Sequence, residues 1–314
     1  MRGSGAPEAR NMPAKTRNRL EPTRIAAALL SVLLAAAGCG PSDEQAENYG
    51  PEAFVTLPPL AFLARQIAGE HVRISVLVRP GANPHTYAAT PKQIIELNRG
   101  GLLLHAGTAF EQTLASRLTR DNDKLTATSV AQGIAHSKAE SDHDHDHDHH
   151  HDEHDQHIWM SPKIAKALTI GICRELSGLD PEHADEFRDN AARLEADLDK
   201  LHTELAGSLA PLKGREFFVF HPAFGHFADE YGLKQVAVET HGKSPGAKHL
   251  TDLIARAKAS ETKVIFAQPQ FSQNAAEAIA REIGGQVVLL DPLSDDYMNN
   301  LRRIAAELRK ALQP

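Results

Sequence analysis

Residues 180–211 read DPEHADEFRDNAARLEADLDKLHTELAGSLAP and predict one long amphipathic helix. Asp180 suits the N-cap, Pro181 suits the first turn, and the Glu182 carboxylate complements the helix dipole. Apolar residues then recur at spacings of three and four. They are Phe187, Ala191, Leu194, Leu198, Leu201, Leu205 and Leu209. About thirty residues at 1.5 Å each form a rod of roughly 45 Å, longer than one small domain needs. We therefore expect this helix to run along two lobes.

On both sides of this helix, short apolar runs alternate with helical patterns. The expected strands before it are residues 53–57, 71–78 and 102–105, with helices at 60–68 and 92–98. The expected strands after it are residues 216–220, 234–238, 263–267 and 286–290, with helices at 250–259, 274–283 and 297–312. This alternation is typical of α/β domains with parallel sheets. The fold class is therefore predicted to be two α/β lobes with mainly parallel sheets, bridged by one long helix.

The expected organisation has five consecutive parts. They are a signal segment (1–38), a flexible tether (39–52), an N-terminal lobe (53–178), a bridging helix (179–213) and a C-terminal lobe (214–314). The N-terminal lobe includes a His- and Asp-rich loop at 136–156, which has no hydrophobic periodicity and is expected to be solvated.

The first 39 residues indicate export. A basic flank precedes the apolar run 25–37, which is too short to span a bilayer comfortably and ends in small residues. Small residues directly before Cys39 resemble a lipobox, so we expect Cys39 to be lipidated. Plain signal cleavage and an uncut N-terminal anchor are the alternatives. The expected location is periplasmic or otherwise extracytoplasmic, on a membrane-anchored lipoprotein.

Charge and cysteine content narrow the functional classes. The net charge is −7, and residues 137–156 alone carry eight acidic residues against one lysine. The sequence has no basic face for nucleic acid. With Cys39 lipidated, Cys173 remains alone and cannot form an intramolecular disulfide. Its place in a helical apolar pattern predicts a buried thiol.

Half of the eighteen histidines lie in residues 136–157. The accessory metal ligands expected in this tract are His143, His145, His147, His149, His150, His151 and His154. Near neutral pH most imidazoles are unprotonated and able to bind metal. We favour a low-affinity zinc collector over a solvated spacer that binds divalent ions only incidentally.

Four other residues have a more specific placement. His85 follows a predicted strand in a proline-flanked turn, His157 precedes a predicted helix start at Ser161-Pro162, His221 ends a strand, and Asp291 ends the last one. In open α/β sheets, ligands bind beyond the carboxyl ends of strands. Three imidazoles and one carboxylate match a four-coordinate zinc site. Each residue taken singly also has a structural explanation, as a loop, strand-end or capping residue.

Three other histidines are not expected to bind the metal. His105 ends its strand and is expected to be a buried group that binds no metal. His226 and His241 are expected at the surface.

The strings at residues 80–87, 157–162, 217–224 and 291–293 resemble the zinc/manganese solute-binding proteins of bacterial ABC importers. The resemblance runs from about residue 53 to the C-terminus, in order. It implies two lobes bridged by a rigid helix, with metal in the cleft between them. The implied ligands are His85 and His157 from the N-terminal lobe, with His221 and Asp291 from the C-terminal lobe.

The resemblance also implies the metal and the partners. Members that select manganese often have a carboxylate at the place of His221, so imidazole there favours zinc. A His-rich loop before the second ligand is typical of the zinc branch. Asn83-Pro84 replaces an acidic residue that can precede the first ligand, which leaves Asp291 or water as the fourth. The implied role is capture of Zn²⁺ and its delivery, by a monomer, to a membrane ABC permease with its cytoplasmic ATPase.

The alternatives are a manganese- or iron-binding homologue, an adhesin-type surface lipoprotein, and a zinc hydrolase. A hydrolase needs an open coordination position and a general base. The sequence has no His-Glu-x-x-His segment and no acidic residue beside His85 or His221. We therefore expect a binding protein and not an enzyme.

Overall fold

The computed structural model describes residues 50–99, 101–120, 122–132, 134, 155–239 and 246–313. The predicted signal segment, Cys39, His241 and the accessory histidines of the tract lie outside these residues. Tyr49–Pro314 form one compact unit. Within the described ranges, no helix has the length and apolar character needed to cross a bilayer.

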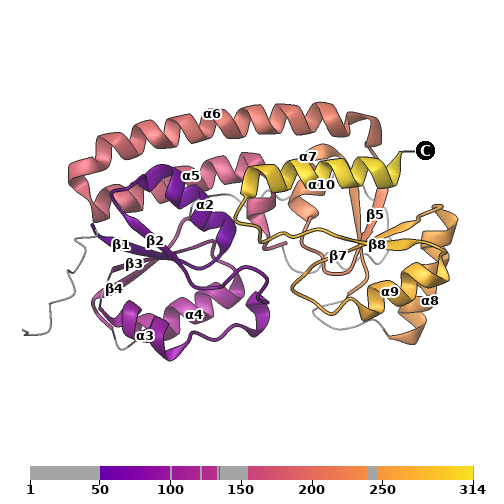
Figure 1. The fold of residues 1–314 in the computed structure, drawn as a ribbon, viewed down its shortest axis with the longest axis horizontal. Coiled ribbons are helices and arrows are strands. Elements are labelled where there is room, and N and C mark those ends of the chain that lie inside the picture. Colours follow the sequence, from indigo (N-terminus) through magenta and orange to yellow (C-terminus); the bar gives the residue numbers. More distant parts are fainter. Residues whose placement is uncertain are drawn as a thin grey trace, which may run out of the picture. The chain divides into compact units, whose positions relative to one another are not determined.

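The first sheet has four parallel strands in the order β2-β1-β3-β4 (Figure 1). They are β1 (Glu52–Val55), β2 (Arg73–Val76), β3 (Gly101–His105) and β4 (Leu125–Ser129), and the accompanying helices are α2 (Pro58–Ala68), α3 (Pro91–Asn98) and α4 (Ala109–Thr119). The first three strands confirm the predicted ones, although β2 is shorter. β4 and α4 were not predicted.

The second sheet repeats this order as β6-β5-β7-β8, again with every strand parallel. Its strands are β5 (Glu216–Val219), β6 (Lys234–Ala237), β7 (Val264–Ala267) and β8 (Gln286–Leu289), and its helices are α7 (Gly225–Tyr231), α8 (Ala247–Ala259), α9 (Asn274–Glu282) and α10 (Tyr297–Leu312). All four predicted strands are confirmed to within a residue at each end. In both sheets the order reverses around the first strand, and such a switch point favours ligand binding at the carboxyl ends.

The helix starts near these carboxyl ends are fixed by side-chain caps. Thr90 and Thr108 each form a capping box, with Gln93 and Glu111 respectively. In α5 (Pro162–Leu179), Ser161 accepts a hydrogen bond from the Ile164 amide, with Pro162 in the first turn. The predicted helix start at Ser161-Pro162 is confirmed.

The long helix is α6 (Ala184–Leu209), which has 26 residues. The predicted start at Asp180-Pro181 is confirmed for a short 3₁₀ turn (Pro181–His183), whose N-cap residue is Asp180, and the α-helix itself begins only at Ala184. The Asp180 carboxylate accepts a hydrogen bond from His183 Nδ1 at 2.7 Å. The apolar stripe from Phe187 to Leu209 is buried as predicted.

Helix α6 packs against α2 and α5 beside the first sheet, and against α7 and α10 beside the second. Figure 1 shows α6 running along both sheets. One hydrophobic cluster accordingly extends from β1 and α2, through α5 and α6, to β5 and α10. Cys173 lies in this cluster, and burial raises the pKa of its thiol. The buried free cysteine is as predicted.

Candidate metal centre

Three of the four predicted ligands meet in space. His85, His157 and His221 each offer a ring nitrogen, and these atoms all lie within 4.8 Å of one another. Among the described residues this is the one group of three or more His, Cys, Asp or Glu side chains close enough to hold an ion. The Nε2 atoms of His157 and His221 are 3.3 Å apart. The three histidines line a cavity of about 350 Å³.

His85 stands in a one-turn 3₁₀ helix (Pro84–Thr86) after β2. The Asn83 side chain accepts a hydrogen bond from the His85 amide at 2.9 Å and begins this turn. The ring lies 5.1 Å from that of His221, centroid to centroid. Partial burial, together with the neighbouring His221 and His157, lowers the pKa of His85. Its imidazole is therefore neutral near pH 7, as a metal ligand must be.

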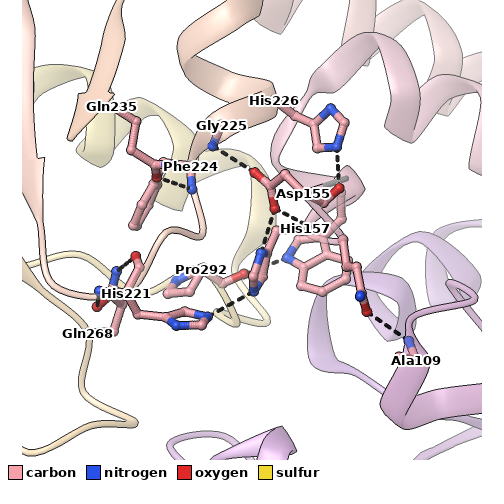
Figure 2. A network of polar contacts seen from close by, with 12 residues as sticks. Ala109, Asp155, His157, His221, Phe224, Gly225, His226, Gln235, Gln268 and Pro292 are labelled. Carbon is pink, nitrogen blue, oxygen red and sulfur yellow. Dashed lines mark hydrogen bonds and ion pairs between the residues drawn. The ribbon is translucent and has the colours of Figure 1, made fainter. Parts of the chain in front are cut away.

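His157 is held by the residue two positions before it. His157 Nδ1 and its own backbone amide donate to Asp155 Oδ1 at 2.7 and 2.9 Å, as Figure 2 shows. The Gly225 amide at the start of α7 donates to Asp155 Oδ2 at 2.8 Å. Burial opposes ionisation of Asp155, but the hydrogen bonds from the His157 side chain and backbone contribute to holding the pKa below its usual value.

The segment after His157 forms hydrogen bonds with residues that accompany the second sheet. Trp159 Nε1 donates to the Pro292 carbonyl at 2.8 Å, and the Tyr297 hydroxyl donates to the Trp159 carbonyl at 2.5 Å. Ser161 also hydrogen-bonds to Glu230 of α7. The resemblance implied that His157 comes from the N-terminal lobe, and this remains a prediction. The segment around His157 contacts elements on both sides of α6, because the Ala109 amide of α4 also donates to Gln156 Oε1 at 2.7 Å.

His221 follows β5 and is buried. His221 Nδ1 donates to Glu239 Oε1 at 3.0 Å, and Glu239 follows the neighbouring strand β6. Gln268, after β7, accepts from the His221 amide at 3.1 Å and donates to its carbonyl at 2.8 Å. Phe271 stacks on the ring with centroids 4.5 Å apart. These contacts leave Nε2 as the free ring nitrogen, facing His157 (Figure 2).

The structure does not bring Asp291 into this group. Asp291 follows β8 as predicted, but Asp291 Oδ1 accepts from Gln270 Nε2 at 2.6 Å and from the Leu293 amide at 2.9 Å. The cavity is lined by Glu239 and Gln270 and not by Asp291. Asp291 therefore shapes the loop that holds Trp159, because that loop includes Pro292.

Two other histidines can be placed. His226 was expected at the surface, which is wrong, because it is half-buried and its Nε2 donates to the Asp155 carbonyl at 2.7 Å. His105 is buried, as predicted, with Nδ1 unpartnered among the described residues. Burial lowers the pKa of His105.

Sequence reasoning missed Asp155, Glu239 and Phe271. The rule that found His221, a polar residue directly beyond a buried strand, also applies to Glu239 two residues after β6. Asp155 was concealed by the many acidic residues preceding it.

Comparison with known proteins identifies the family of the chain. A family model described as zinc-uptake complex component A, periplasmic (ZnuA), matches residues 54–311. The high-affinity zinc uptake system protein ZnuA of Yersinia pestis is 32% identical over 295 residues, covering 85% of this chain and 93% of that protein. The manganese-binding lipoprotein MntA of Bacillus subtilis is 26% identical, covering 87% and 90%.

Solved structures agree with these sequence matches. A crystal structure of ZnuA matches with a TM-score of 0.77 and 36% identity, covering 84% of this chain and 100% of that one. A laminin-binding protein of Streptococcus agalactiae, at 20% identity and a TM-score of 0.72, shares the fold. The predicted two-lobe α/β architecture is confirmed, and the chain belongs to the ZnuA family of periplasmic components of zinc-uptake complexes.

Proposed function

We propose that this protein captures Zn²⁺ outside the cytoplasm and delivers it to an ABC permease. The observation that carries the proposal is the convergence of His85, His157 and His221 within 4.8 Å, with no carboxylate in that group. Imidazole nitrogen suits zinc, whereas manganese favours carboxylate, carbonyl and water oxygens. Zinc is the cargo, bound by three protein ligands with water as the fourth.

The names of similar proteins point the same way. The Yersinia pestis relative is a high-affinity zinc uptake system protein. A ZnuA deletion mutant was crystallised with zinc bound. Its sequence is 36% identical to that of this chain, and the match covers 84% of this chain and 100% of the mutant. The manganese-binding relative is less similar, and the histidine at position 221 favours the zinc alternative.

The partners follow from this role. The ion is released to the membrane subunit of an ABC importer, driven by its cytoplasmic ATPase. The protein acts as a monomer held near that membrane by a lipid on Cys39. The tract with His143, His145, His147, His149, His150, His151 and His154 acts as an accessory zinc collector.

Hydrolysis is the weaker function for this site. A zinc hydrolase needs a carboxylate positioned to deprotonate the metal-bound water. The carboxylates nearest the cluster, Asp155 and Glu239, each accept a hydrogen bond from the Nδ1 of a ligand histidine. They support the ligands and are not placed as bases.

Metal analysis tests the proposal. Protein purified without added zinc is analysed for bound metals, then titrated with zinc and with manganese against a chromophoric chelator. We expect one tight zinc site that manganese in excess does not empty. Tight manganese binding with weak zinc binding would overturn the proposal. Zinc-dependent turnover of ester, peptide or phosphoester substrates, abolished by His221→Ala, would replace it with the hydrolase alternative.

A further inference from the structure

The three histidines are not equivalent. His157 and His221 each present Nδ1 to a carboxylate, at 2.7 Å for Asp155 and 3.0 Å for Glu239. Among the described residues no carboxylate lies within hydrogen-bond distance of the His85 ring. His85 is also the most exposed of the three, whereas His157 is half-buried and His221 is buried.

Asp155 is held by backbone donors, and Glu239 is held by burial. Asp155 is bonded by two backbone amides, those of His157 and Gly225, and its side chain is 21% exposed. The Glu239 side chain is 5% exposed. A carboxylate withdrawn from water needs a hydrogen-bond partner, and an imidazole N–H is a partner of each one here.

The hydrogen bonds set the tautomer of each ring. An ionised carboxylate only accepts, so the proton of each neutral imidazole resides on Nδ1 and the lone pair on Nε2. Both Nε2 atoms face each other across 3.3 Å. Each carboxylate thus aims a ligand lone pair at the place between His157 and His221.

The negative charges of Asp155 and Glu239 also suit a role beside bound zinc. Three neutral imidazoles leave a bound Zn²⁺ with its full charge of +2. Asp155 and Glu239 each bring one negative charge, one ring away from the ion. Their positions offset the charge of the ion without placing a carboxylate oxygen on it, so the ligands from the protein remain nitrogen, which favours zinc over harder ions.

We propose that Asp155 and Glu239 are positioning residues for zinc, an inference that rests on the proposed function. They hold His157 and His221 as a preformed pair of nitrogen ligands, and His85 completes the site. Carboxylates behind metal-binding histidines also raise the basicity of the ligand nitrogen, and their loss typically weakens metal binding by about 10- to 100-fold.

The test uses the amide variants Asp155→Asn and Glu239→Gln. An amide oxygen still accepts from Nδ1–H, so each ring keeps a hydrogen bond while the negative charge is lost. Zinc affinity is measured by chelator competition, and the absorption of the Co²⁺-loaded protein is recorded. We expect each variant to bind zinc about 10- to 100-fold more weakly. A shifted Co²⁺ spectrum is the expected signature of an altered ligand field, which a purely structural role would not produce.

Asp180→Asn is the matched control. Asp180 accepts from His183 Nδ1 at 2.7 Å, the same kind of pair, in the turn before α6. It should leave zinc affinity and the Co²⁺ spectrum unchanged. If Asp180→Asn lost as much zinc affinity as Asp155→Asn, the proposal would be overturned, because the loss would not then depend on a carboxylate beside a ligand histidine.

Gly225→Ala provides a second variant that alters no charge. A Cβ at Gly225 would lie 2.5 Å from Asp155 Oδ2, so the carboxylate must move. We expect weaker zinc binding at a normal apoprotein melting temperature. If both amide variants and Gly225→Ala bind zinc within threefold of the wild type, the positioning role is wrong while the proposed function stands. If the wild type itself binds no zinc, the proposed function fails.

Discussion

His157 Nε2 and His221 Nε2 lie 3.3 Å apart, although the two residues are 64 positions apart in the chain. Two nitrogens bound tetrahedrally to one zinc at about 2.0–2.1 Å are separated by roughly 3.4 Å. The pair therefore already has the spacing that the ion requires. Little ordering of these two side chains is needed on binding, which favours tight capture.

The first prediction concerns the order of importance of the ligands. His157→Ala and His221→Ala should each weaken zinc binding more than His85→Ala does. Each of the first two removes half of the preformed pair, whereas His85→Ala leaves that pair intact. Chelator competition measures all three, with exposed His249→Ala of α8 as the control. Equal losses of zinc affinity in all three variants would contradict a preformed pair of His157 and His221.

Zinc should stabilise the folded protein. A ligand that binds only the native state stabilises it by about 4 kcal/mol when its concentration is 1,000 times the Kd. Scanning calorimetry should therefore show a higher Tm with zinc for the wild type. His221→Ala should show almost no shift. An unchanged wild-type Tm at saturating zinc would count against a tight site.

The hydroxyl of Tyr297 should matter for stability. It is fully buried and donates to the Trp159 carbonyl at 2.5 Å. Burial raises the pKa of Tyr297, so the hydroxyl remains a donor throughout the physiological range. Tyr297→Phe should cost about 1–2 kcal/mol in urea denaturation, since a buried carbonyl loses its donor. Tyr231→Phe is the comparison, because its hydroxyl lies 3.5 Å from His202 Nδ1, and it should cost less.

Two glycines of α5 should respond in opposite directions to alanine. At Gly171 a Cβ would lie 2.5 Å from the Val130 carbonyl oxygen, so helix and loop must separate. Gly171→Ala should destabilise the protein by about 1–3 kcal/mol. At Gly178 no atom lies within 4 Å of the added Cβ, and Gly178→Ala should be neutral or stabilising by up to about 1 kcal/mol. Thermal melts of both variants check this, and equal changes in Tm would contradict the close packing of α5 against Val130.

The periodic elements could be predicted because their pattern is strong. The stripe from Phe187 to Leu209 predicted α6, and α10 has the bounds expected from its apolar spacing. The strand β4 could not be predicted, because its sequence LTATS is mostly polar and only its first residue is buried. An edge strand with little buried surface carries a weak hydrophobic signal.

The site was predictable in part, for a related reason. His85, His157 and His221 stand at element ends, and the parallel topology brings such ends together. Asp291 occupies an equivalent end, yet Gln270 and the Leu293 amide take up its carboxylate oxygen. Contacts of this kind depend on side chains from other loops, which no spacing rule reveals. The same holds for the bond between Asp155 and Gly225.

The most direct measurement is a competitive zinc titration of three proteins side by side: the wild type, a variant lacking residues 137–154, and His221→Ala. The deletion ends before Asp155, so the hydrogen bonds that hold His157 are retained. We predict that the deletion variant keeps the tight site while His221→Ala loses it. Loss of the tight site in the deletion variant, with His221→Ala unaffected, would contradict a metal centre built from His85, His157 and His221.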